Sequence, residues 1–129
     1  MLKQDAQATL VAYRDALVAR DEAAMRALFA DDSIVFENGK AEGSFSQYLE
    51  HHLGPELGEI TEFTFTNPTM SVRVVGHVAF GYETYRYRIA LKDGRVIERD
   101  GVATSVLTHT DGVWKIVQYH SSSRAPRPN

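Results

Sequence analysis

The chain has 129 residues, 43% of them hydrophobic and 24% charged, which is the length and composition of one globular domain. It contains no cysteine, so a disulfide framework, a thiolate metal site and a cysteine nucleophile are all excluded. The formal net charge of −3 gives no reason to expect nucleic acid as a partner. No apolar run approaches the ~18 residues of a membrane span or resembles a signal-peptide core, so we expect one soluble, cytoplasmic domain over residues 1–129.

The N-terminal part predicts two helices. Leu10, Tyr13 and Leu17 recur at spacings of 3 and 4, which places them on one face of a helix. Asp21 is a suitable N-cap for a second helix, because its carboxylate can accept hydrogen bonds from the free N–H groups of the first turn. We expect this second helix to end near residues 31–32.

A short strand and a third helix are expected next. Residues 33–36 form an apolar run that predicts a strand, and the Asn-Gly pair at residues 38–39 ends it with a turn. Ser44 can cap a third helix, whose apolar side carries Phe45, Tyr48, Leu49 and His52. The Gly-Pro pair at residues 54–55 is expected to break or kink this helix, because proline has no N–H group to donate.

From Ile60 onward the hydrophobic period becomes two, which is typical of strands. The Asp-Gly pairs at residues 93–94 and 111–112 are strong hairpin signals, and Gly76 marks a further turn. We therefore expect four long antiparallel strands at about residues 60–75, 77–91, 95–109 and 113–122. Long antiparallel strands after a helical N-terminal part predict an α+β fold.

Both faces of the expected sheet are apolar. In the strand at residues 77–91, Phe80 and Tyr82 point to one face, while Tyr85 and Ile89 point to the other. Three short helices can cover only one face, and a large uncovered apolar face is typical of an interaction surface. We therefore expect a homodimer formed through the sheet.

Three stretches of the sequence resemble one superfamily. They are residues 13–21, residues 27–32 and residues 111–122, the last of which contains D-G-x-W followed by Y-H-x-S. Together with the order of elements, they resemble the NTF2-like, or cystatin-like α+β, superfamily over nearly the whole chain. The last stretch is similar to the SnoaL-like/DUF4440 branch and to the association domain of calcium/calmodulin-dependent kinase II. The resemblance implies a cone, in which N-terminal helices pack on a curved antiparallel sheet and enclose one pocket.

The resemblance also implies a site like that of the ketosteroid isomerases. Tyr13 matches their first-helix tyrosine, which donates a hydrogen bond to the substrate oxygen, and Glu37 falls where their catalytic base ends the first strand. Ser105 stands where they carry a protonated aspartate, so this part of their oxyanion hole differs. His120, in the Y-H-x-S ending, shares the strand parity of Trp114 and is expected to face the pocket, where a histidine can exchange a proton near neutral pH.

We expect no metal and no cofactor. Neighbouring residues on a helix diverge by about 100°, so His51 and His52 cannot easily bind one ion. Neither H-x3-H nor H-E-x-x-H occurs, and the glycines form neither a dinucleotide fingerprint nor a P-loop.

The leading hypothesis is a cofactor-free small-molecule enzyme of the SnoaL or ketosteroid isomerase type, which isomerises, cyclises or dehydrates an apolar carbonyl compound. Glu37 follows an apolar strand and would move the proton, while Tyr13 and His120 would stabilise the oxyanion. The residues expected to line the pocket are Tyr85, Ser105, Trp114 and Gln118. The alternative is a non-catalytic dimerisation and ligand-binding module like the kinase association domain, which the serine at position 105 favours. A third possibility is an accessory protein with a vestigial pocket.

Overall fold

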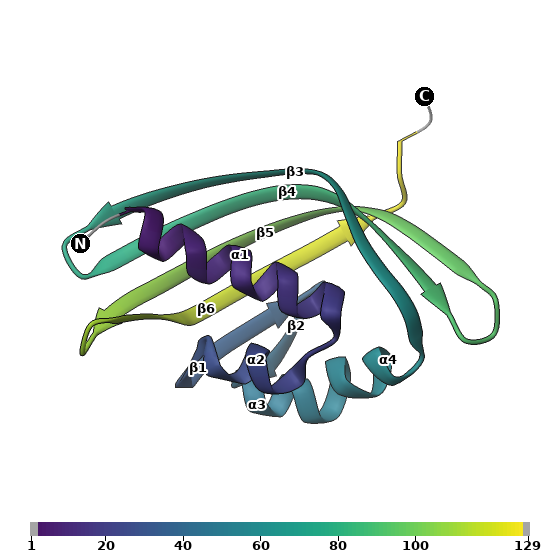
Figure 1. Cartoon of the computed structure of the whole chain (residues 1–129), viewed down its shortest axis with the longest axis horizontal. Helices are drawn as coiled ribbons and strands as arrows, with labels where there is room; N and C mark the ends of the chain where they lie inside the picture. Colours follow the sequence, from purple (N-terminus) through teal and green to yellow (C-terminus); the bar gives the residue numbers. More distant parts are fainter. Residues whose placement is uncertain (1–2, 128–129) are drawn as a thin grey trace.

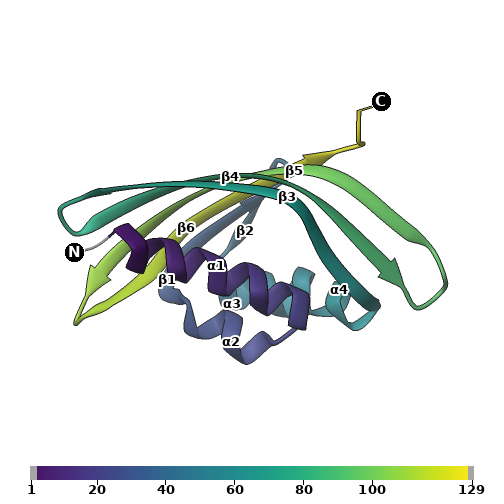
Figure 2. The same cartoon turned by 45° about the horizontal axis from the view of Figure 1, so that its top comes forward.

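Helices cover one face of a curved six-stranded sheet in the computed structural model, which describes residues 3–127 (Figure 1). The strand order is β2-β1-β6-β5-β4-β3, and β1 runs parallel to β6. The elements are α1 (Lys3–Ala19), α2 (Glu22–Ala27), β1 (Phe29–Glu37), β2 (Lys40–Gly43), α3 (Phe45–Tyr48), the π-helix η1 (Leu49–Leu53), α4 (Gly54–Gly58), β3 (Ile60–Val75), β4 (Val78–Leu91), β5 (Val96–Thr110) and β6 (Val113–Arg124). Figure 2 shows all labelled helices on the same side of the sheet, as the expected α+β cone requires. Among the described residues, no helix has the length and apolar character needed to cross a membrane.

The first helix and the start of the second follow the sequence pattern. Leu10 and Tyr13 are buried against the sheet, and the Asp21 carboxylate accepts a hydrogen bond from the Ala24 N–H (3.1 Å) at the start of α2. However, α2 ends at Ala27, before the expected residues 31–32. The chain continues directly into β1. Its first residue, Phe29, pairs with Ile116 of β6 and is buried in the core.

The third helix continues through the Gly-Pro pair that was expected to break or kink it. Ser44 and Gln47 form a reciprocal capping box at its start. Further along, the N–H of Gly54 donates a hydrogen bond to the carbonyl of Leu49, five residues back. This wider turn is the π-helix η1, called the π-turn below, and it ends just before Pro55. An added Cβ on Gly54 would lie only 2.5 Å from the Leu49 oxygen, so glycine is required for this turn.

The four long strands lie within one or two residues of their predicted bounds. One irregularity between β5 and β6 changes which side chains face the helices. Val106 pairs with Gln118 and Leu107 with Ile116, so Val117 has no partner and forms a β-bulge. The alternation of side chains therefore reverses after Ile116, and Tyr119 becomes the buried residue.

This bulge overturns one expectation. His120 and Gln118 were expected to face the interior with Trp114, but both are exposed. They lie on the outer face of the sheet, where His120 pairs with Thr104 and Phe36 on the neighbouring strands. Trp114 precedes the bulge and is buried.

Candidate active site

A cavity of about 500 Å³ lies between the helical layer and the concave face of the sheet. Its volume is in the range of small-molecule sites. Aromatic side chains from α1, α3 and three strands form much of its wall, namely Tyr13, Tyr48, Phe63, Phe65, Tyr85, Tyr87 and Tyr119.

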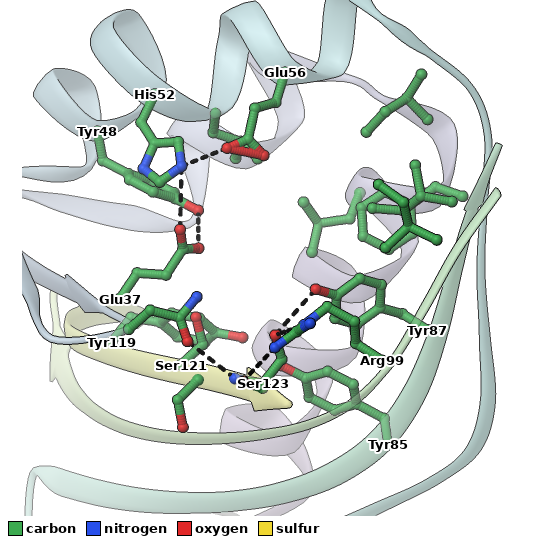
Figure 3. Close-up of a pocket in the computed structure, with 18 of the residues that line it drawn as sticks. Glu37, Tyr48, His52, Glu56, Tyr85, Tyr87, Arg99, Tyr119, Ser121 and Ser123 are labelled. Atoms are coloured by element: carbon green, nitrogen blue, oxygen red, sulfur yellow. Dashed lines mark hydrogen bonds and ion pairs between the residues drawn. The ribbon is translucent and has the colours of Figure 1, made fainter. Parts of the chain in front are cut away.

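A carboxylate, a phenol and an imidazole meet at one wall of this cavity (Figure 3). Glu37 is the last residue of β1, where the turn to β2 begins. The Tyr48 hydroxyl donates a hydrogen bond to Glu37 Oε1 (2.7 Å), and His52 Nε2 lies 3.2 Å from Glu37 Oε2. Because the π-turn belongs to the same helical segment as Tyr48, it brings His52 over the end of β1.

Two further glutamates contact the same imidazole. Glu42, whose side chain is only 4% exposed, contacts His52 Nδ1, and Glu56 contacts Nε2 from the next helical turn. Lys40 lies 3.6 Å from the Glu42 carboxylate and partly offsets its charge. Both ring nitrogens therefore face carboxylates, and a doubly protonated ring can donate from each of them.

The surroundings of His52 and Glu56 raise the pKa of both groups, so each holds its proton more strongly. Burial opposes the charged imidazolium, but the hydrogen bond to Glu42 and the charges of Glu56 and Glu37 outweigh it and raise the pKa of His52. Burial also raises the pKa of Glu56, against the lowering effect of the neighbouring imidazolium. The cluster therefore places a group that holds its proton more strongly than usual next to a carboxylate that can accept one.

Three other tyrosines supply neutral hydrogen-bond donors. Burial raises the pKa of Tyr13, Tyr85 and Tyr119, so their hydroxyls stay protonated over the physiological range. All three line the cavity, and within residues 3–127 none of these hydroxyls has a hydrogen-bond partner. They are free to donate to a bound ligand.

The structure brings together only some of the residues that the sequence singled out. Tyr13, Glu37 and Tyr85 line the cavity. Ser105 and Trp114, expected as pocket residues, are instead buried in the core, because the interior at these positions is filled by packed side chains such as Leu10 and Leu107. Gln118 and His120 were also expected at the pocket, but the bulge turns both side chains to the outer face of the sheet.

Sequence reasoning did not identify several polar residues of the site. His52 was placed on the apolar side of its helix but was considered only as a partner of His51. The spacing of His52 and Glu56, one helical turn apart, was a usable signal. Nothing local pointed to Glu42 or Arg99, because they come from other parts of the chain and meet the cavity only in the folded protein.

Three residues of the cluster could hold a divalent cation. Glu37, His52 and Glu56 each offer one ligand atom, and these atoms lie within 4.8 Å of one another. Carboxylate oxygens and an imidazole nitrogen suit several divalent metals. A site with one histidine and two glutamates carries no paired-histidine motif, so the sequence patterns did not predict it.

We expect that a chelator leaves the thermal unfolding midpoint unchanged, because His52 is already held by contacts with the glutamates. Differential scanning fluorimetry with and without EDTA, followed by added zinc, tests this expectation. A fall with EDTA that zinc reverses in the wild type but not in Glu56→Gln would identify the cluster as a metal site.

Comparison with known proteins agrees with this architecture. The chain belongs to the SnoaL-like domain family, whose model matches residues 6–126. No curated protein matches the chain.

Solved structures extend the likeness. A candidate ketosteroid isomerase from Shewanella frigidimarina is 28% identical, with a TM-score of 0.80 over 92% of this chain and 94% of that one. A candidate dehydratase of the NTF2-like family from Streptomyces avermitilis is 16% identical, with a TM-score of 0.82 over 95% and 97% of the two chains. A candidate association domain of calcium/calmodulin-dependent protein kinase II from Xanthomonas campestris is 21% identical, with a TM-score of 0.75 over 92% and 84%. The last two support the fold alone.

Proposed function

We propose that this protein is a cofactor-free enzyme of the ketosteroid isomerase type, which moves a proton on an apolar carbonyl compound. The observation that carries the proposal is the position of Glu37 in an aromatic cavity that Tyr13 also lines. The candidate isomerase from Shewanella supports the same class of reaction. The test is a screen of apolar enones, polyketide-like ketones and epoxides for turnover that is lost in the variant Glu37→Gln.

The proposed reaction needs a base, a donor and a route for the proton. Glu37 removes a proton from carbon next to the carbonyl group, and the negative charge that develops on the carbonyl oxygen is stabilised by a tyrosine hydroxyl, Tyr13 or its neighbour Tyr119. His52, 3.2 Å from Glu37, can exchange a proton with it. Return of the proton to another carbon completes an isomerisation, whereas its transfer to a β-hydroxyl group, which then leaves as water, completes a dehydration.

A non-catalytic ligand-binding module is the second proposal. Position 105 favours it, because the buried Ser105 hydroxyl cannot replace the acidic donor of the ketosteroid isomerases and lies outside the cavity. In this case the cavity would still bind an apolar molecule, but no substrate in the screen would be turned over. The screen therefore separates the two proposals.

We also propose that the protein forms a homodimer through the outer face of the sheet. Phe80 (37% exposed), Tyr82 (48%) and Val102 (50%) lie on this face, on adjacent strands β4 and β5. Ile34 on β1 lies on the same face and is 48% exposed, but Gln118 on β6 separates it from Val106 on β5. Exposed apolar side chains gathered on adjacent strands of one face are typical of an interface.

Val106 pairs with Phe80 in the middle of this outer face, so Val106→Asp is expected to produce a monomer or an aggregating species. Multi-angle light scattering measures the mass. The control is Val18→Asp, the same substitution at an exposed position (41%) on α1, on the helical side of the sheet, which should stay dimeric. A stable wild-type monomer at micromolar concentration would rule out the dimer.

A further inference from the structure

Arg99 is held at a second wall of the cavity by a small hydrogen-bond network. Its Nε donates to Ser123 Oγ (2.7 Å) and its Nη2 donates to the Ser123 carbonyl (2.9 Å). The Tyr87 hydroxyl lies 3.2 Å from the same Ser123 Oγ, and the Ser123 N–H donates to Asn38 Oδ1 (3.0 Å). The guanidinium is therefore oriented by neutral groups, and Nη1 has no protein partner among the described residues.

Arg99 also has no counter-ion in the described part of the chain. Within residues 3–127, no carboxylate lies within ion-pair distance of Arg99, whereas carboxylates pair with Arg14, Arg86, Arg88 and Arg95. An arginine keeps its charge in proteins, and a half-buried charge without a partner is costly. A positive group held in this way at a ligand cavity points to an anionic group on the ligand.

The two walls of the cavity carry opposite charges. Figure 3 shows Arg99 on the side of Tyr85 and Tyr87, across the cavity from Glu37, His52 and Glu56. Gly101 leaves room for the aromatic ring at this wall, because an added Cβ there would lie 2.3 Å from Tyr85. A negatively charged ligand group is repelled by the glutamates and attracted to the arginine, so charge alone sets the direction in which a ligand lies.

We propose that Arg99 binds a carboxylate of the substrate, so that the substrate class is a small apolar carbonyl compound that also carries an acid group. The inference rests on the proposed function for its reactive end, but its binding end rests on Arg99 alone. The guanidinium and the carboxylate are planar partners that can form paired hydrogen bonds. Binding at Arg99 directs the rest of the molecule toward Glu37.

Binding of matched acids and amides tests the proposal without requiring turnover. The probes are hydrocinnamate and cinnamate, compared with hydrocinnamamide and cinnamamide, with dissociation constants measured by NMR titration. We expect the acids to bind about 10- to 100-fold more tightly than the amides, and Arg99→Gln to remove this preference. The control Arg95→Gln makes the same change at an exposed turn arginine and should keep the preference for acids.

Three results would overturn the proposal: no binding of either acid, equal binding of acids and amides, or an acid preference that survives in Arg99→Gln. The variant Glu37→Gln tests the carboxylate subsite separately from the proposed function, because this variant should keep the acid preference while losing turnover. If turnover depends on Glu37 but acids have no advantage, only the carboxylate subsite is wrong. If acids are preferred but Glu37→Gln turns over substrate normally, the proposed catalytic role is wrong and the subsite stands.

Discussion

Replacing Glu37 with glutamine is expected to lower kcat by about 10²- to 10⁴-fold on any substrate that the screen identifies, because loss of a general base removes this much rate. Glutamine has nearly the same shape, and its amide oxygen can still accept the hydrogen bond from Tyr48. The effect should therefore appear in turnover rather than in folding. Steady-state kinetics of the two proteins, with circular dichroism as a check on structure, gives the measurement.

The matched control for this substitution is Glu62→Gln on β3. Glu62 is 58% exposed and pairs with Arg88 at the surface, so the same chemical change there should leave kcat within about twofold. Equal turnover by wild type and Glu37→Gln would exclude Glu37 as the base. The cavity would then be assigned to ligand binding, or to a reaction in which His52 alone moves the proton.

Replacing Tyr13 with phenylalanine is expected to lower kcat by about 10²- to 10³-fold, the loss typical of one donor to a developing oxyanion. Stability should change little, because the Tyr13 hydroxyl has no protein partner in the described structure. The ring contacts are kept, since phenylalanine preserves the edge-on packing against Phe29 (5.1 Å between centroids) and Tyr119 (5.2 Å). Kinetics and thermal unfolding of the same preparation separate the two effects.

Two variants show whether this donor is specific. Tyr82→Phe removes a hydroxyl from the outer face of the sheet, where 48% of the residue is exposed, and should not change kcat. Tyr119→Phe removes the other free hydroxyl close to Tyr13. If Tyr119→Phe carries the whole loss and Tyr13→Phe none, the oxyanion donor is on β6 rather than on α1.

Local sequence signals were sufficient for most of the fold. The two Asp-Gly pairs predicted hairpins, and β4, β5 and β6 are joined by turns at those positions. Asp21 and Ser44 were recognised as helix caps because their side chains act within their own first turns. These predictions depend on residues only a few positions apart, where periodicity and side-chain chemistry are informative.

The composition of the site could not be obtained in the same way. His120 was expected inside the cone because strand alternation was extended without interruption, but the bulge at Val117 turned it outward and brought Tyr119 inward. No residue type in that segment signals a bulge. Similarly, the Gly-Pro pair suggested an interrupted helix, whereas a π-turn accommodated it and carried His52 to Glu37.

Patterns along the chain were enough to predict the α+β order of elements, the caps and the hairpins, and the resemblance pointed to Tyr13 and Glu37 as candidate groups. Which charged groups meet depends on how the elements pack, because Glu37, Glu42, His52 and Arg99 come from different elements. Strand register, one bulge and one π-turn set their directions, and each arises from packing and hydrogen bonding across the whole sheet. The opposite charges at two walls of the cavity are therefore a property of the fold that no single segment encodes.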